Sequence, residues 1–577
     1  MKYIKDFFSN RIVISFIISV LIYCSLCFQD ILVPYNILSF ILFGVIYYFI
    51  YNVKIDNNYR KDLLLLSSVF SLILIIGRIL YSFRYNSKID FFDEFISLKN
   101  IVYFFGNGLL IFFLLSLIVP KLISYQNKNR KINKNVFIIS LLIIIICYIP
   151  YLIIFFPAII TGDTISEIQM IQNIIPISDH HTLFHVIFMM IPFKIGEFIF
   201  DNINISIGLI SFTQIIIMSL TFAYTVNFLN KRKLPINIIV IILLFYALLP
   251  INGFYSVTLW KDIIFSCSII LLTIECYKLL EKKDNINFKN SYMFIIVSLF
   301  AVFTRNNAIY MYILLALISI IVFRKQLRVI IPMFIIVFTC YGLVKGPVYN
   351  YFGINTSSSS EYLAIPLQQI GRMAYKNVEF TKNEKKLINK LMPIDELKKS
   401  YNAEIVDAIK FNKKYNSKVF ENNKIKYLKL WLSLCAKHPK IAIEAYMTST
   451  LGYWYPGTEY WVTTASIDKN NLGIKNYSFV SEDNRLKISK IVSNNFPLIG
   501  FLNSIGLYIW LTIIISYILI RKVNKKIIYA FTPVFGIWLS ILIATPVFSE
   551  FRYTYCIVLT LPLFFGMIFI NNKINKE

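Results

Sequence analysis

The chain has 577 residues, of which 57% are hydrophobic and only 15% charged, and its mean hydropathy is +0.65. These totals exclude an ordinary soluble protein, because a soluble core stops growing well below this size and leaves too much apolar surface uncovered. The net charge of +27 would suggest a nucleic-acid partner in a soluble protein. Membrane topology alone explains the charge here, so we expect a membrane protein that binds no nucleic acid.

Apolar segments recur along the chain at the length of a membrane-spanning helix, which is roughly 20 residues. We predict an all-α polytopic protein with about fourteen spans. The predicted spans lie near residues 11–28, 33–52, 62–81, 101–119, 136–156, 204–228, 236–252, 262–280, 290–304, 307–323, 329–345, 498–520, 527–547 and 553–570.

The orientation follows from the Lys and Arg residues of the short loops, which concentrate on the cytoplasmic side. With the N-terminus inside, the basic stretches 121–134, 231–233 and 521–526 all face the cytoplasm. This orientation places both termini in the cytoplasm and any active site on the outer face of the cell membrane. It holds only if the apolar segment 182–200, which contains Pro192, lies in the outer interface instead of spanning.

We divide the chain into four parts: an N-terminal four-helix membrane extension (1–135), a membrane core (136–345) whose first outer loop is 157–203, a mainly helical extracytoplasmic domain (346–497), and the C-terminal membrane helices (498–577). The outer domain contains the serine run 357–360 and amphipathic helical patterns at 383–400 and 421–450. About 150 residues suffice for a separate core.

Two carboxylates at helical spacing begin the first outer loop. Asp163 follows Gly162 and precedes a predicted helix at 164–174, so it suits a helix N-cap. It also suits a general base whose basicity partial desolvation would raise. Glu167, four residues on, could share a divalent cation with Asp163, although the sequence assigns no cofactor.

The same loop carries Asp179 and three of the four histidines, His180, His181 and His185. His181 and His185 are also four residues apart and could join a metal site. The alternative is that the histidines anchor the interfacial helix through backbone or headgroup contacts. Contact between His181 and a sugar or phosphate stays open.

Basic residues also occur at three separate points on the predicted outer face. They form the motifs Trp260-Lys261-Asp262, Arg305-Asn306-Asn307 and Glu550-Phe551-Arg552-Tyr553. Converging cations would bind a phosphate or pyrophosphate headgroup. Each could instead be an anchor whose charged end reaches the interface.

An aromatic cluster, which includes Trp454 and Tyr455, lies at 451–461 near the end of the outer domain. Aromatic rings stack on sugars and also populate membrane interfaces. We expect contact with a saccharide or lipid.

Taken in order, these motifs resemble the membrane glycosyltransferases of the GT-C superfamily and, more narrowly, an uncharacterised bacterial family of multi-spanning proteins. The resemblance covers about 136–570 and rests on residues 162–164, 179–181, 260–262, 305–307, 438–439, 453–456 and 552–553. It implies that Asp163 matches the superfamily's essential base. It also implies that Arg305 and Arg552 meet the donor phosphate.

The resulting hypothesis is an inverting glycosyltransferase that uses a polyprenyl-phosphate-linked sugar. Its acceptor would be a cell-envelope glycan, teichoic acid, glycolipid or protein. Asp163 is the predicted catalytic residue. The predicted substrate-binding residues are Glu167, Asp179, His180, His181, Lys261, Arg305, Asn306, Trp454, Tyr455, Arg552 and Tyr553. A polysaccharide polymerase or ligase is an alternative, and a lipid or saccharide transporter fits less well, because most spans lack charges at mid-membrane.

Overall fold

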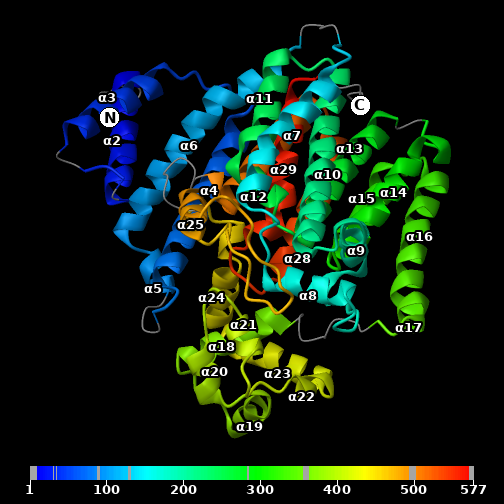
Figure 1. The fold of residues 1–577 in the computed structure, drawn as a ribbon. Coiled ribbons are helices and arrows are strands. Elements are labelled where there is room, and N and C mark those ends of the chain that lie inside the picture. The colour runs from blue at the N-terminus through cyan, green and yellow to red at the C-terminus, as the bar shows by residue number, and fades with distance from the viewer. Residues whose placement is uncertain are drawn as a thin grey trace. The chain divides into compact units, whose positions relative to one another are not determined.

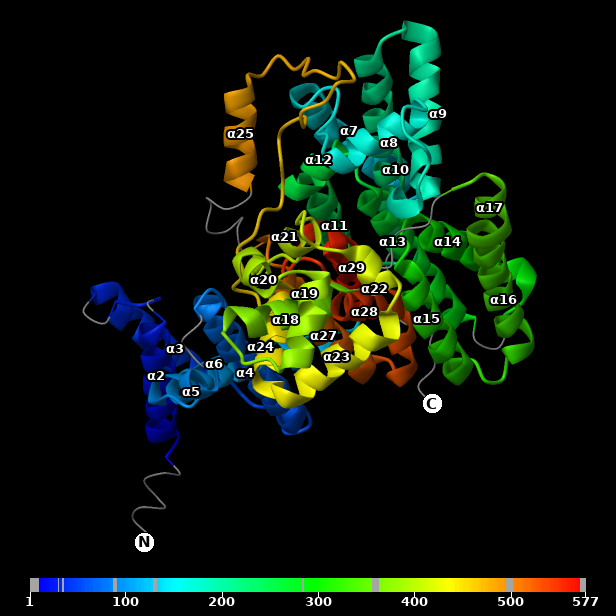
Figure 2. The same ribbon diagram turned by 90° about the horizontal axis from the view of Figure 1, so that it is seen from below.

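A computed structural model describes residues 10–29, 31–33, 36–86, 91–127, 132–282, 285–354, 363–492 and 502–570. Apart from isolated β-bridges, the regular structure of these residues is entirely helical (Figures 1 and 2). The contacts divide the chain into two compact units. The first comprises 1–125, 365–458 and 546–548, and the second comprises 126–364, 459–545 and 549–577.

Eleven helices in the described part of the chain are long and apolar enough to cross a membrane. They are α2 (Arg11–Phe28), α4 (Arg60–Phe83), α6 (Leu98–Ser124), α7 (Val136–Ile154), α9 (Leu183–Phe200), α10 (Ile203–Lys231), α13 (Lys261–Glu281), Leu327–Tyr351 (α16, η2 and α17), α27 (Ile505–Lys522), Lys525–Ile543 (η6 and α28) and α29 (Phe551–Ile568). The protein is therefore an all-helical polytopic membrane protein.

The other predicted spans are shorter or broken. α3 (Ile37–Asn52), α14 (Phe288–Thr304) and α15 (Ala308–Val322) have 16, 17 and 15 residues. The segment predicted as one span at 236–252 consists of α11 (Ile236–Leu248) and α12 (Pro250–Ser256), which meet at a 50° bend. Pro250 explains the break, because proline cannot donate a helical hydrogen bond. The start of the predicted span 498–520 lies partly outside the described residues.

α9 is the segment predicted to lie in the outer interface, although its length and apolarity also suit a span. It is seen nearly end-on in Figure 1, where α7 and α10 are seen from the side, and it is seen lengthwise in Figure 2. α9 therefore runs across these two helices, as an interfacial helix would. Its position in a membrane stays a prediction.

The first unit joins the N-terminal helices to a group of polar helices. Besides α2, α3, α4 and α6 it contains α5 (Phe91–Phe95), α18 (Ala364–Tyr375), α19 (Lys382–Leu391), α20 (Ile394–Ser400), α21 (Asp407–Lys410), α22 (Ser417–Glu421), α23 (Lys424–Lys437), α24 (Pro439–Ser449) and η4 (Leu451–Tyr453). Arg372 of α18 is buried, forms an ion pair with Glu444 and donates to the carbonyl of Arg84 at 2.6 Å. Since a buried guanidinium must be paired, this contact fixes α18 to the end of α4.

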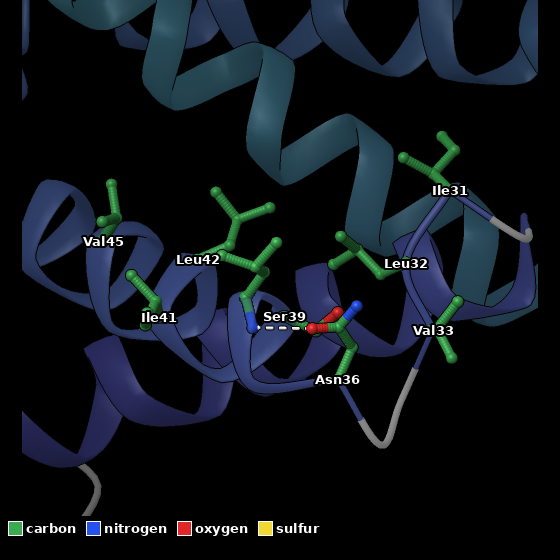
Figure 3. A pocket seen from close by; sticks show the side chains of 9 residues that line it. Ile31, Leu32, Val33, Asn36, Ser39, Ile41, Leu42 and Val45 are labelled. Atoms are coloured by element: carbon green, nitrogen blue, oxygen red, sulfur yellow. Dashed lines mark hydrogen bonds between the residues drawn. The ribbon is translucent and has the colours of Figure 1, made fainter.

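A hollow in the first unit lies beside α3 and is lined mainly by aliphatic side chains, among them Ile31, Leu32 and Leu42 (Figure 3). Among the described residues, its polar lining consists of Asn36 and Ser39.

The second unit is a bundle in which α13 packs against α10, α14, α28 and α29. Most residues of α13 and α29 are buried. At the break between α11 and α12, the Asn252 amide donates to the carbonyls of Phe245 (3.1 Å) and Tyr246 (3.2 Å). The Phe245 carbonyl also accepts from the Leu249 N–H at 3.3 Å, whereas the helical donor of Tyr246 would be the N–H that Pro250 lacks, so the amide compensates for the proline at Tyr246. The unit also contains α8 (Gly162–Ile171), η1 (Asp179–His181) and α25 (Glu482–Lys490).

Candidate active site

The predicted cap at Asp163 is wrong, because α8 begins earlier than the pattern indicated. Its N-cap is Thr161, and Asp163 lies in the first turn. The backbone N–H of Gly162 donates instead to Asp468 Oδ2 at 2.8 Å, so a carboxylate 306 residues away satisfies this helix end. Ile165 and Ile168 face a buried apolar cluster. Asp163 is thereby free of the capping role.

Two chain segments that are about 100 residues apart are fixed side by side at the site. Ile159 and Thr258 form a parallel bridge. The Thr164 hydroxyl donates to the Leu259 carbonyl at 2.7 Å, and the Trp260 indole donates to the Thr161 hydroxyl at 2.9 Å. The start of α8 is therefore held against the start of α13.

A small pocket lies where α8, η1 and the N-termini of α13 and α29 meet. It is lined by Asp163, Glu167, His181, Leu259, Trp260, Lys261, Asp262 and Arg552. Three of the motifs singled out in the sequence, together with the last histidine of the 179–181 motif, therefore contribute to one pocket. The N-termini of helices also favour anions, because their first N–H groups and dipoles point at the ligand.

Asp163 and Arg552 form an ion pair across the pocket, with 3.0 Å between Oδ2 and a guanidinium nitrogen. Burial raises the pKa of Asp163, but Arg552, Lys261 and His181 outweigh it and hold the pKa below its ordinary value. The expectation that desolvation makes Asp163 more basic is therefore wrong for the ligand-free protein, because the cations stabilise the carboxylate.

Arg552 is restrained on several sides. Its Nε lies 3.5 Å from Glu550 Oε1, and its guanidinium lies 5.1 Å from the ring centroid of Trp260 and 5.3 Å from that of Tyr553. Its side chain is 18% exposed, whereas that of Asp163 is 46% exposed. Arg552 is thus the fixed member of the pair.

Lys261 brings a positive charge that has no close negative partner. Its ammonium donates to the backbone carbonyl of His180 at 3.0 Å. Among the residues that the structure describes, it forms no ion pair with a carboxylate. An ammonium has three donors, so Lys261 keeps donors for an anion.

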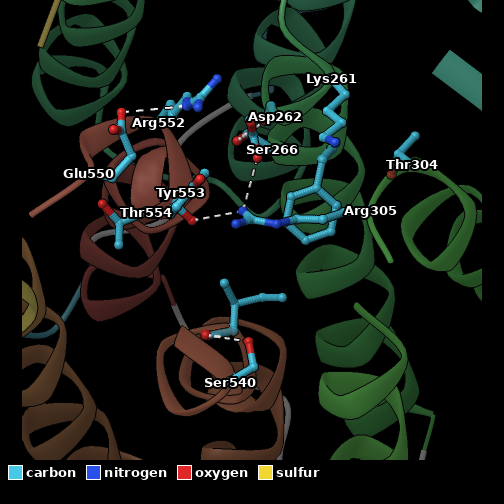
Figure 4. Close-up of polar contacts among 12 residues, drawn as sticks. Lys261, Asp262, Ser266, Thr304, Arg305, Ser540, Glu550, Arg552, Tyr553 and Thr554 are labelled. Atoms are coloured by element: carbon cyan, nitrogen blue, oxygen red, sulfur yellow. Dashed lines mark hydrogen bonds and ion pairs between the residues drawn. The ribbon is translucent and has the colours of Figure 1, made fainter. Parts of the chain in front are cut away.

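Arg305, by contrast, is buried and has a carboxylate partner. It lies 3.0 Å from Asp262 Oδ1 and donates to the Tyr553 carbonyl at 3.2 Å, and its guanidinium lies 4.7 Å from the Tyr553 ring centroid. Figure 4 shows Arg305 between Asp262 and Tyr553, with Arg552 beside Glu550. Burial raises the pKa of Glu550 to about 7, against the lowering effect of Arg552. Within the described ranges neither Arg305 nor Tyr553 lines this pocket, although Arg305 is paired with the lining residue Asp262.

The histidines have different surroundings. Glu167 Oε1 lies 2.9 Å from His185 Nδ1, and both side chains are buried. His181 lines the pocket; burial lowers its pKa to about 4, so its ring is neutral at pH 7, and its Nδ1 is buried without a hydrogen-bond partner. His180 is exposed. Within the described ranges, no three His, Cys, Asp or Glu side chains gather to hold a metal ion.

Asp179 and Asn306 belong to a closed hydrogen-bond network beside the pocket. The Asp179 carboxylate accepts from Lys345 at 2.6 Å and from the Tyr349 hydroxyl at 2.8 Å. Asn306 accepts from Lys345 at 2.8 Å and donates to the Asp179 backbone carbonyl at 2.9 Å. In the ligand-free protein these two residues, predicted to bind substrate, are thus bonded to each other and to Lys345, and these bonds hold η1, which carries His181.

The predicted aromatic site at 451–461 is divided, because Trp454 and Tyr455 belong to the first unit while Trp461 belongs to the second. The Tyr455 ring packs on Gly77 of α4, where an added Cβ would come within 2.2 Å of it. The Trp454 indole donates to the Thr450 hydroxyl at 3.2 Å. Both side chains therefore have partners within their own unit.

Sequence reasoning did not assign roles to Glu550, Lys345, Tyr349 or Asp468. Lys345 stands at the polar end of an apolar span, where a lysine is typical of an interface anchor. Glu550 carried the clearest signal, since it lies two residues before Arg552 in a predicted outer loop.

No curated protein and no solved structure matches this chain. One family profile does match, over residues 172–576, and its description is "Family of unknown function (DUF6020)". That range includes every pocket residue except Asp163 and Glu167. Because the match covers well over half of the sequence, the chain belongs to the DUF6020 family.

Proposed function

We propose that this protein is a membrane glycosyltransferase that moves a sugar from a polyprenyl-phosphate carrier to a cell-envelope acceptor. The observation that carries the proposal is the pocket's charge arrangement. Lys261, which contacts a backbone carbonyl and no carboxylate among the described residues, and the fixed Arg552 line one small pocket with the half-exposed carboxylate of Asp163. The cations suit a phosphate, and the carboxylate suits a proton acceptor.

The proposed step is a single displacement. An acceptor hydroxyl oxygen attacks the anomeric carbon, a new carbon–oxygen bond forms, and the bond between that carbon and the phosphate oxygen breaks. Asp163 takes the hydroxyl proton, and the carrier leaves as a polyprenyl phosphate. Lys261 and Arg552 would stabilise the charge that develops on the leaving phosphate.

The location of the pocket supports a membrane-tethered donor. The pocket lies at the N-terminal ends of α13 and α29, two helices long and apolar enough to span. The basic loop 231–233 precedes α11 and the basic loop 521–526 precedes α28. The far ends of α11 and α28 lead to the pocket, so the positive-inside rule predicts a pocket on the outer side.

The alternatives receive less support from these contacts. A polymerase or ligase that relies on outer-face arginines would need Arg305, which is committed to Asp262 and to the Tyr553 carbonyl. A transporter would need an ion or substrate path, and the charged residues described above gather instead at one end of the bundle.

The direct test is replacement of Asp163 by asparagine in a strain that lacks the wild-type gene. We expect envelope glycan transfer to fall at least about 100-fold, because a lost general base typically costs 10²–10⁴ in rate, while membrane levels stay normal. Mass spectrometry of envelope glycans measures the outcome. Glu197→Gln is the matched control, since the Glu197 side chain is half-exposed and pairs with its neighbour Lys194 outside the pocket. Wild-type glycans in the Asp163→Asn strain would contradict the proposal.

A further inference from the structure

The Asp163–Arg552 pair occupies the place where the proposed donor phosphate would bind. Arg552 is the best-fixed cation of the pocket, and in the ligand-free protein Asp163 accepts its hydrogen bond. A phosphate and Asp163 would compete for this guanidinium, because both are anions that accept from the same N–H groups.

We propose that Asp163 is a placeholder: a phosphate that enters the pocket displaces its carboxylate from Arg552 and thereby frees it to accept a proton. The inference rests on the proposed function and adds an order of events to it. The base becomes available only when the donor is in place.

The unequal restraint of the two side chains supports this order. Asp163 has a short side chain that is 46% exposed, and within the described ranges its ion pair is the one with Arg552. Arg552 has a second carboxylate partner in Glu550 and lies against the rings of Trp260 and Tyr553. When an anion arrives, Asp163 can turn away at little cost, whereas Arg552 stays where it is.

The charged residues around the Asp163–Arg552 pair also support displacement of Asp163 by a phosphate. Of the carboxylates that line the pocket, Asp262 is paired with Arg305 and Glu167 with His185, whereas Asp163 is the one paired with Arg552. A phosphate has enough oxygen atoms to accept from Lys261 and Arg552 together, which Asp163 does not do in the ligand-free protein. Once displaced, Asp163 loses its cation and gains an anionic neighbour, and both changes raise its basicity.

The inference predicts that Asp163→Asn strengthens phosphate binding while it abolishes transfer. Purified protein in nanodiscs would be titrated with a polyprenyl monophosphate and, separately, with inorganic phosphate. We expect Asp163→Asn to bind the polyprenyl monophosphate about fivefold more tightly or better, since an ion pair worth about 1 kcal/mol no longer competes. If the phosphate group alone is recognised, Asp163→Asn should also bind inorganic phosphate more tightly than wild type does. A gain in affinity for the polyprenyl monophosphate alone would assign the site to the lipid headgroup.

Three comparisons make the result decisive. Glu197→Gln removes a negative charge outside the pocket and should leave the affinity unchanged; an equal gain there would overturn the inference, since net charge would explain it. Equal or weaker binding by folded Asp163→Asn and Asp163→Ser proteins would overturn the placeholder role alone and leave the transferase proposal standing. Absence of binding by wild type and variants alike would overturn the phosphate site itself, and with it both proposals.

Discussion

Glu550 and His181 are buried titratable residues at the pocket, and their pKa values are shifted in opposite directions. Burial raises the pKa of Glu550 from 4.5 to about 7, so this residue disfavours the folded state increasingly as the pH rises through that range. Burial lowers the pKa of His181 from 6.5 to about 4, so this residue disfavours the folded state increasingly as the pH falls through that range. Between pH 5 and 6.5 the two effects largely cancel.

Single substitutions should expose each effect separately. In Glu550→Gln the remaining His181 makes the apparent melting temperature rise from pH 5 to pH 7, and in His181→Gln the remaining Glu550 makes it fall. Each slope corresponds to a change of at most about 3 kcal/mol in the free energy of unfolding between the unfolded-state and folded-state pKa of the group. Thermal unfolding in detergent at several pH values measures both. Parallel slopes in the two variants would contradict these assignments, and Glu197→Gln, which alters a half-exposed carboxylate, should behave as wild type does.

At the scale of the elements, α10 positions the start of α13 through one buried side chain. The Gln214 amide donates to the carbonyls of Tyr255 at 2.9 Å and Thr258 at 2.8 Å, just ahead of Trp260 and Lys261. The Tyr255 carbonyl lies in the last turn of α12, and the Thr258 carbonyl lies in the short segment between α12 and α13. A glutamine from another helix therefore holds the segment that carries the pocket's lysine.

We expect Gln214→Leu to destabilise the protein by about 2 kcal/mol, because it removes the buried amide donor of the Tyr255 and Thr258 carbonyls, of which Thr258 keeps the Trp260 N–H at 3.0 Å. It should also increase hydrogen exchange of the amides at 255–262. Thr213→Val is the matched control, since that hydroxyl bonds only to the Leu209 carbonyl of its own helix. Unchanged exchange at 255–262 in Gln214→Leu would show that this segment is held by other contacts.

For the whole molecule, the question is which side of the membrane the pocket faces. The basic loops predict an external pocket, and this depends on α9 not crossing the bilayer. A crossing by α9 would place the stretch 231–233 outside, against the positive-inside rule.

Labelling of introduced cysteines tests the orientation. In a background without the native Cys435, Gly162→Cys should react with a membrane-impermeant maleimide in intact cells, because Gly162 is exposed beside the pocket. Lys233→Cys should react only after permeabilisation. Labelling of both positions from the same side would mean that α9 spans, and labelling of Gly162→Cys from the cytosol alone would contradict an external active site.

The sequence by itself determined the membrane class, the approximate helix positions and the loops that carry the chemistry. These follow from apolar segment length and from charge, which are local properties. It also singled out Asp163, His181, Lys261 and Arg552, because charged groups at the ends of apolar helices are conspicuous.

Only the tertiary structure decided how these residues divide their roles. Arg305 forms an ion pair with Asp262, Asp179 forms one with Lys345, and Asp163 pairs with Arg552, which is 389 residues away in the chain. Such pairings depend on which helix ends meet in the folded bundle. The pKa values depend on the same packing, because burial and neighbouring charge act through space and leave no trace in local sequence patterns.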